Sequence, residues 1–132
     1  MNFGKWEPKD GVLVCQRIKA DDHAAASRWQ IPLQDGVIEF SLKFSGGKVF
    51  HVGFDPKRGT LDKKGHLYSL IISPTGAQLK KHRDKAKEGS EDEVLARAKH
   101  KLEPEKWVSV RLEAKGNTVN CLLYTSDAAD EE

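Results

Sequence analysis

The sequence VIEFSLKF, residues 37–44, alternates apolar and polar side chains without interruption. Successive side chains of a β-strand point to opposite faces, so this alternation is typical of a strand with one buried and one solvated face. The buried face would carry Ile38, Phe40, Leu42 and Phe44. This stretch therefore predicts a half-buried strand, and it is the clearest element of the sequence.

Further stretches on either side of residues 37–44 also have strand character. They are rich in β-branched or aromatic residues, or they alternate, and turn-forming residues such as Asp10-Gly11 and Ser73-Pro74-Thr75-Gly76 separate them. The predicted strands are Val12 to Cys15, Val49 to Phe54, His66 to Ser73, Trp107 to Ala114, and one that begins at about Val119. The side chains expected to point inward include Phe50, Val52, Phe54, Val108, Val110 and Leu112.

The region between Lys80 and Glu93 is almost entirely charged, with basic side chains first and acidic ones after them. We interpret it as a solvated hairpin loop. The stretch that follows, Ser90 to His100, leaves two alternatives open. It could be a short helix with Ser90 as N-cap and Glu93 three residues later, or it could be a strand, because its apolar residues fit neither period.

Seven or so short strands with at most one helix predict an all-β protein, and specifically an antiparallel β-sandwich. A length of 132 residues suits one domain. Hydrophobic residues make up 38% of the chain and charged residues 32%, which suits a small packed core and excludes wholesale disorder. No apolar stretch approaches the roughly 18 residues of a membrane helix, so we expect no membrane association.

The last twelve residues, CLLYTSDAADEE, differ in character from the rest of the chain. Their first eleven resemble one reading frame of a transposon-based sequencing-library adapter. We therefore expect residues 1–120 to be a β-sandwich fragment, incomplete at its C-terminus, and residues 121–132 to be an adapter-derived tail that is not native. The tail holds four of the 20 acidic residues and no basic one, so residues 1–120 carry 22 basic and 16 acidic side chains, a net charge of +6.

The chain offers little for disulfide or metal chemistry. Cys15 and Cys121 allow one disulfide at most, and none within the native part if Cys121 is adapter-derived. No CxxC-type spacing occurs, and no two of His51, His66 and His82 lie at ligand spacing within one predicted element. We therefore expect surface or cross-strand roles for these histidines, no metal site, and no cofactor.

Several short segments resemble a known family. The opening GKWEPKDGVLV, from Gly4 to Val14, is similar to the start of the 3-keto-disaccharide hydrolase-like domains, where a Trp is followed by Asp-Gly-Val-Leu. Asp35 to Phe40, Glu105 to Trp107 and Ala114 to Asn117 resemble further segments of that family. Over residues 4–120 the resemblance implies a concanavalin A-like lectin/glucanase jelly roll and a sugar-related, usually exported (periplasmic or extracellular) protein.

The departures from this family concern its acidic and basic positions. Where relatives of the sugar hydrolases carry acidic residues in one strand, this chain has Ser69 and Ser73, and where they carry an arginine in another strand it has Asp55. No strand carries the carboxylates at period two that laminarinase-type jelly rolls use, because Glu39 is followed by Ser41 and Lys43. The resemblance therefore assigns no catalytic residue.

Two functions from different classes remain. The first is a binding module that presents His51, Asp55, Tyr68 and Trp29 to a glycan without catalysis. The second is a glycoside-cleaving enzyme whose acid and base lie in loops or in strands beyond this chain. A sheet with serines at positions 69 and 73 has no evident proton donor, which favours the binding module. A purely structural domain is a third reading of the same pattern.

The aromatic and basic residues each have an alternative role. Trp29, Trp107 and Tyr68 could stack against a sugar ring, but each is flanked by strand pattern, which favours core positions. The basic run Lys80, Lys81, Arg83, Lys85 and Lys87 could bind nucleic acid, but it has no interleaved aromatic residues and acids follow at once. We therefore expect a solubilising loop and no nucleic-acid partner.

Overall fold

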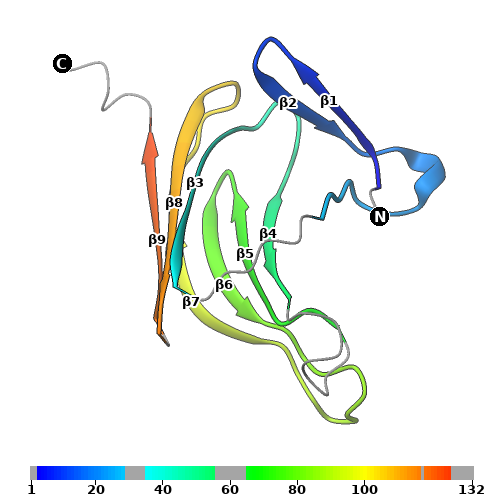
Figure 1. Cartoon of the computed structure of the whole chain (residues 1–132), viewed down its shortest axis with the longest axis vertical. Helices are drawn as coiled ribbons and strands as arrows, with labels where there is room; N and C mark the ends of the chain where they lie inside the picture. Colours follow the sequence, from blue (N-terminus) through cyan, green and yellow to red (C-terminus); the bar gives the residue numbers. More distant parts are fainter. Residues whose placement is uncertain (1–2, 29–34, 56–64, 117, 126–132) are drawn as a thin grey trace. The chain divides into compact units, whose positions relative to one another are not determined.

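The computed structural model describes residues 3–28, 35–55, 65–116 and 118–125 (Figure 1). The chain divides into two compact units, Met1–Gln34 and Asp35–Glu132, which we describe separately. Apart from one short 3-10 turn, the regular structure of the described residues is entirely β-strand, and every strand pair is antiparallel. The predicted all-β class is therefore confirmed.

The first unit is a β-hairpin followed by the 3-10 turn. β1 (Lys5–Lys9) pairs with β2 (Val12–Gln16), which is the strand predicted from Val12, whereas β1 was not predicted. Asp10 and Gly11 between them both have positive φ, 52° and 77°, as the type I′ turns favoured by Asp-Gly require. The 3-10 turn η1 (Lys19–Asp21) returns to the start of the hairpin, where Asp21 Oδ2 accepts a hydrogen bond from the Gly4 amide at 2.7 Å.

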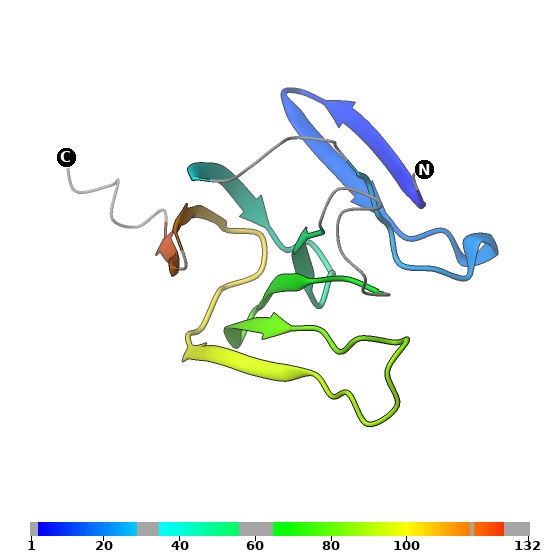
Figure 2. The same cartoon turned by 60° about the horizontal axis from the view of Figure 1, so that its bottom comes forward.

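The second unit contains two antiparallel sheets (Figures 1 and 2). One has the order β3-β8-β9, formed by β3 (Gly36–Lys43), β8 (Trp107–Lys115) and β9 (Thr118–Thr125). The other is a meander, β4-β5-β6-β7, formed by β4 (Phe50–Phe54), β5 (Tyr68–Ser73), β6 (Gly76–Lys81) and β7 (Glu93–Lys99). The chain therefore leaves the first sheet after β3, completes the second, and returns to place β8 beside β3.

The two sheets of this unit share one hydrophobic core. Its most buried side chains come from both sheets, with Leu70 and Ile72 from β5, and Val110 and Leu112 from β8. The rings of Phe40 on β3 and Phe50 on β4 lie 5.6 Å apart between their centroids. The side chains predicted to point inward belong to this core, apart from Val108, which is buried outside the cluster. Burial of side chains from two sheets in one core is what a sandwich requires.

The structure corrects the expectation for one part of the chain and decides between the two alternatives for another. Lys80 and Lys81 belong to β6, a strand that was not predicted, so the solvated loop is shorter and joins β6 to β7 at residues 82–92. Of the two alternatives for Ser90 to His100, the strand is correct, as β7. Its seven residues are all exposed, which explains why its sequence shows no buried face.

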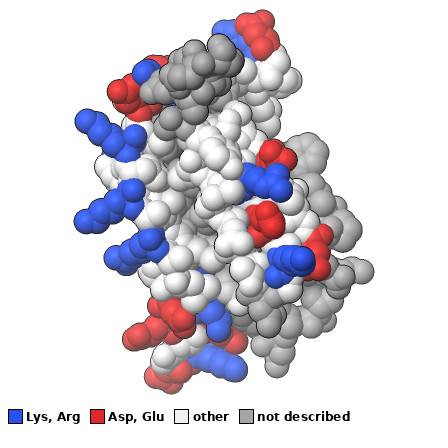
Figure 3. All heavy atoms as spheres, turned by 90° about the vertical axis from the view of Figure 1, so that its left-hand side faces the viewer, with Lys and Arg blue, Asp and Glu red and all other residues white. Residues whose placement is uncertain are grey.

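Trp107 was expected in the core, but it lies on the outer face of the three-stranded sheet and is 38% exposed. There Lys43 Nζ lies 5.2 Å from its ring centroid, and Arg111 forms a cross-strand ion pair with Glu39 at 3.1 Å. Figure 3 shows the side of the molecule where β9 lies, with charged side chains of both signs around a surface that carries none. The polar candidates for a functional site belong to the other sheet.

The C-terminal strand β9 extends through residues 121–125, with Leu112 opposite Cys121 and Val110 opposite Leu123. The strand predicted to begin at about Val119 is therefore present, and its pairing continues beyond residue 120. The assignment of residues 121–132 to an adapter, and of the native domain to residues 1–120, stays a prediction. Cys15 and Cys121 are both free thiols, and burial raises the pKa of each.

Candidate functional site

The candidate site lies on the outer face of the four-stranded sheet, at the end where β4 and β6 finish and β5 and β7 begin. Gly53, Ser69 and Lys80 form one row across β4, β5 and β6. Their neighbours Val52, Leu70 and Leu79 form the next row, and Val52 and Leu70 belong to the core. Since successive side chains of a strand alternate, Ser69 and Lys80 are placed on the outer face.

Two histidines, His66 and His82, lie at this end, and we call them the histidine cluster. Ser69 Oγ lies 2.7 Å from His82 Nε2, and the His82 amide continues the pairing of β5 with β6 by donating to the Leu67 carbonyl at 2.9 Å. The rings of His66 and His82 have centroids 5.5 Å apart. The cross-strand role expected for these side chains is therefore confirmed for His82.

Asp55 holds the second histidine of the cluster. Its Oδ2 lies 3.0 Å from His66 Nδ1, and its Oδ1 accepts a hydrogen bond from the Leu67 amide at 3.3 Å. One carboxylate at the end of β4 thus fixes both the His66 ring and the backbone that leads into β5. The contact is solvent-exposed, so it contributes orientation more than stability.

His51 lies on β4 on the same outer face, opposite Ile71. Burial lowers the pKa of His51, and the charges of Lys80 and His66 lower it further. Its ordinary value is 6.5, so the imidazole is neutral at pH 7. A neutral imidazole offers one donor and one acceptor, which suits a hydroxyl-bearing ligand.

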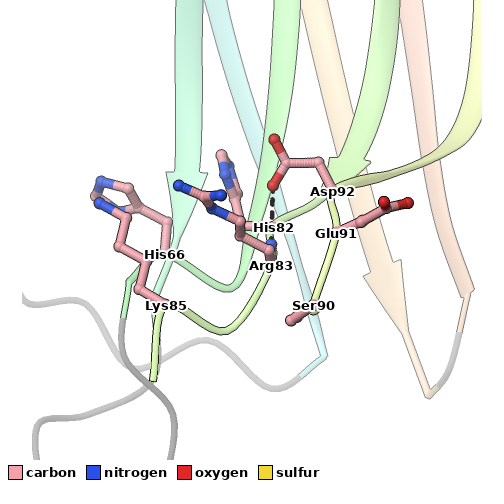
Figure 4. Close-up of a pocket in the computed structure, with 7 residues that line it drawn as sticks. All are labelled: His66, His82, Arg83, Lys85, Ser90, Glu91 and Asp92. Atoms are coloured by element: carbon pink, nitrogen blue, oxygen red, sulfur yellow. Dashed lines mark hydrogen bonds between the residues drawn. The ribbon is translucent and has the colours of Figure 1, made fainter. Parts of the chain in front are cut away.

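A cavity of about 360 Å³ lies beside the histidine cluster and is lined mostly by the loop that joins β6 to β7 (Figure 4). Its lining comprises His66, His82, Arg83, Lys85, Ser90, Glu91 and Asp92. The loop is held in shape from within, because Ser90 Oγ accepts a hydrogen bond from the Asp84 amide at 2.8 Å, and Asp92 Oδ1 accepts one from the Arg83 amide at 2.9 Å. The loop that lines the cavity is therefore held in its conformation by its own hydrogen bonds.

Asp92 is the carboxylate most closely engaged in this wall. The hydrogen bond from the Arg83 amide is the largest of the causes that lower its pKa, followed by the hydrogen bond from Lys80, whose Nζ lies 3.0 Å from Oδ2. A carboxyl group with a lowered pKa is ionised at neutral pH. It cannot supply the proton that cleavage of a glycosidic bond requires.

The Ser69–His82 contact resembles half of a nucleophilic triad, but its burial argues for a structural role. Ser69 is only 4% exposed, so the carbonyl of a substrate cannot reach Oγ. Among the described residues, no group of three His, Cys, Asp or Glu side chains could hold a metal ion. The arrangement therefore suits hydrogen bonding to a ligand better than chemistry on it.

Of the four residues predicted to bind a ligand, the structure places Asp55 at this end of the sheet, beside His66. His51 shares the outer face but lies near the start of β4, opposite Ile71, and does not line the cavity. Tyr68 pairs with Phe54, whose side chain packs against the core, so the tyrosine lies on the opposite face of the sheet from His51 and is half-buried. Trp29 lies outside the described residues. The structure adds Ser69 and His82, whose contact depends on the unpredicted strand β6.

Comparison of the chain with models of known families, with curated proteins and with solved structures finds no match. In the described part of the chain, no helix has the length and apolar character needed to cross a bilayer. The fold and the site together define the second unit as an antiparallel β-sandwich with a polar cavity at one end of its four-stranded sheet.

Proposed function

We propose that this chain is a carbohydrate-binding β-sandwich module that holds a glycan at the histidine cluster without cleaving it. The observation that carries the proposal is the cavity of about 360 Å³ beside the cluster, since ligand pockets typically measure about 300 to 1,000 Å³. Its surroundings combine imidazoles, a serine and carboxylates, which can donate to and accept from sugar hydroxyls.

The proposal includes the finer points of the family resemblance. Two antiparallel sheets packed on one core support a jelly roll of the concanavalin A-like kind, related to the 3-keto-disaccharide hydrolase-like domains, and such a module would act outside the cytoplasm. Binding is preferred over hydrolysis because Asp92 has a lowered pKa and Asp55 is engaged by His66. Neither is placed to act as the general acid of a glycosidase.

A glycan array followed by hydrolysis assays on the same preparation tests this function. We expect binding without release of sugar. We also expect His66→Ala to weaken binding by about tenfold, as loss of one hydrogen bond to the ligand would. His23→Ala is the matched control, because His23 is exposed in the first unit. Turnover of a bound glycan, or equal binding by both variants, would contradict the proposal.

A further inference from the structure

Two cationic side chains, Arg83 and Lys85, line the cavity. Among the residues that the structure describes, neither the Arg83 guanidinium nor the Lys85 ammonium group has an ion-pair partner. The acid nearest in sequence to Arg83 across the loop, Asp92, is already bound by the Arg83 amide and by Lys80. The positive charge of this wall is therefore available to a ligand.

The two cations face the same region. In Figure 4 the side chains of Arg83 and Lys85 point in the same direction as the rings of His66 and His82, while Glu91 points to the opposite side. The Lys85 stem lies over Gly65, where an added Cβ would be 3.5 Å from both Cγ and Cδ. This contact limits where the ammonium group can lie, which reduces the entropy cost of binding an anion.

We propose that the cavity selects an acidic saccharide, whose oxyanion binds between Arg83 and Lys85 while its hydroxyls meet the histidine cluster. The inference rests on the proposed glycan-binding function and names the class of glycan. The oxyanion is a uronate carboxylate or a sulfate ester, since both accept charge-assisted hydrogen bonds from a guanidinium and an ammonium group. A neutral sugar would leave both cations unpaired.

The distribution of basic side chains favours binding of a single oxyanion group over binding of a polynucleotide backbone. The basic run of the sequence does not form a continuous stripe, because Lys80 and Lys81 alternate to opposite faces of β6 and Lys80 is paired with Asp92. A polynucleotide needs several cations along its backbone to gain affinity at moderate salt. Of the described lysines and arginines, Arg83 and Lys85 are the two that line the cavity, and neither forms an ion pair with another described residue.

Isothermal titration calorimetry on the full chain tests the proposal with four probes. These are a short oligouronate, a sulfated oligosaccharide, a neutral oligosaccharide of equal length, and a single-stranded oligonucleotide. The double variant Arg83→Gln/Lys85→Gln removes both cations. The double variant Lys48→Gln/Lys115→Gln is its charge-matched control, because both lysines are exposed and lie outside the cavity wall. Thermal midpoints of all three proteins establish that the substitutions leave the fold intact.

We expect at least one acidic saccharide to bind about tenfold or more tightly than the neutral one, and the cavity variant alone to lose this preference. The uronate and sulfate arms then identify the oxyanion. Equal binding of acidic and neutral saccharides by the unchanged chain would overturn the inference while leaving the proposed function intact. Tightest binding of the oligonucleotide, or no binding of any saccharide, would overturn both. An equal loss of affinity in the two double variants would show a non-specific charge effect and would also overturn the inference.

Discussion

Ser69 Oγ lies 2.7 Å from His82 Nε2, which ties a buried hydroxyl on β5 to the first residue beyond β6. Ser69 is the one described polar residue that is fully buried, with 4% exposure. A buried hydroxyl needs a hydrogen-bond partner, because burial without one costs the full desolvation of the group. The contact therefore stabilises the sheet end that carries the cavity.

Ser69→Ala should lower the free energy of unfolding by about 1 kcal/mol, because it removes this hydrogen bond. Urea unfolding followed by tryptophan fluorescence measures the change. Ser41→Ala is the control, since Ser41 is exposed on the outer face of β3. Equal midpoints for the two variants would show that the Ser69–His82 contact carries no net stability.

Stability should fall on acidification through the range in which His51 becomes protonated. The folded protein has a lowered pKa for His51, while the unfolded chain has the ordinary value of 6.5, so the unfolded state binds the proton more readily. The stability linked to His51 is therefore complete above pH 6.5 and is lost as pH falls through the folded-state pKa.

Urea midpoints measured at closely spaced values between about pH 7.5 and about pH 4.5 check this direction. The salt concentration is held constant, because salt screens charge interactions. His51→Gln should flatten the upper part of the curve, because glutamine cannot take up a proton. Lys80→Gln should reduce the slope, since the charge of Lys80 contributes to the lowered pKa of His51. A profile that His51→Gln leaves unchanged would assign the pH dependence to other groups.

The sequence predicted best those strands that bury one face, because burial of one face produces alternating apolar and polar residues. The alternation of residues 37–44 corresponds to β3, and Val108, Val110 and Leu112 are buried as expected, at 3%, 2% and 2% exposure. The sequences of β1 and β7 show no such alternation, because most or all of their side chains are exposed. These strands are specified by backbone pairing with a neighbour, which a one-dimensional pattern does not show.

The candidate site was predictable only in part for a related reason. The pattern identified the strand that carries His51 and ends just before Asp55, and of these two residues Asp55 lies at the site, beside His66. The contact of His82 with Ser69 requires the register of β5 against β6, and β6 was not predicted because Lys80 and Lys81 resemble a charged loop. Tyr68 was a candidate both for ligand binding and for the core, and its register with Phe54, whose side chain packs in the core, decides for the inner face.

Gly76 should tolerate no side chain, although its backbone is not in the left-handed region. An added Cβ would lie 2.8 Å from the Ala98 carbonyl oxygen on β7, so the two strands would have to move apart. Gly76→Ala should lower the free energy of unfolding by about 1 to 3 kcal/mol, as overpacking does. Gly53→Ala is the matched control on β4, because nothing lies within 4 Å of its added Cβ.

Chemical denaturation of both glycine variants gives the comparison directly. Gly53→Ala should be neutral or slightly stabilising, because alanine has less conformational freedom than glycine in the unfolded chain. A loss of stability at position 53 as large as that at position 76 would show that close approach of β7 is not the cause.

The edge strand β7 should promote self-association through its exposed apolar residues. Among the described residues β7 pairs only with β6, and a register shift opposite Leu79 and Lys80 leaves Leu95 outside the pairing, at 44% exposure. An exposed apolar edge presents unpaired backbone groups to another chain, and a lysine on such an edge opposes pairing. Leu95→Lys should therefore slow aggregation on warming, with a change in stability within about 0.5 kcal/mol.

Light scattering at a fixed protein concentration measures the aggregation rate. Val49→Lys adds the same charge at a residue that is 51% exposed and lies outside the strands, so it controls for net charge alone. If self-association proceeds through β7, Leu95→Lys slows it severalfold more than Val49→Lys does. Only at position 95 would pairing of β7 with another chain remove the new lysine from water, which costs free energy. Equal slowing by both variants would mean that overall charge, and not this edge, governs association.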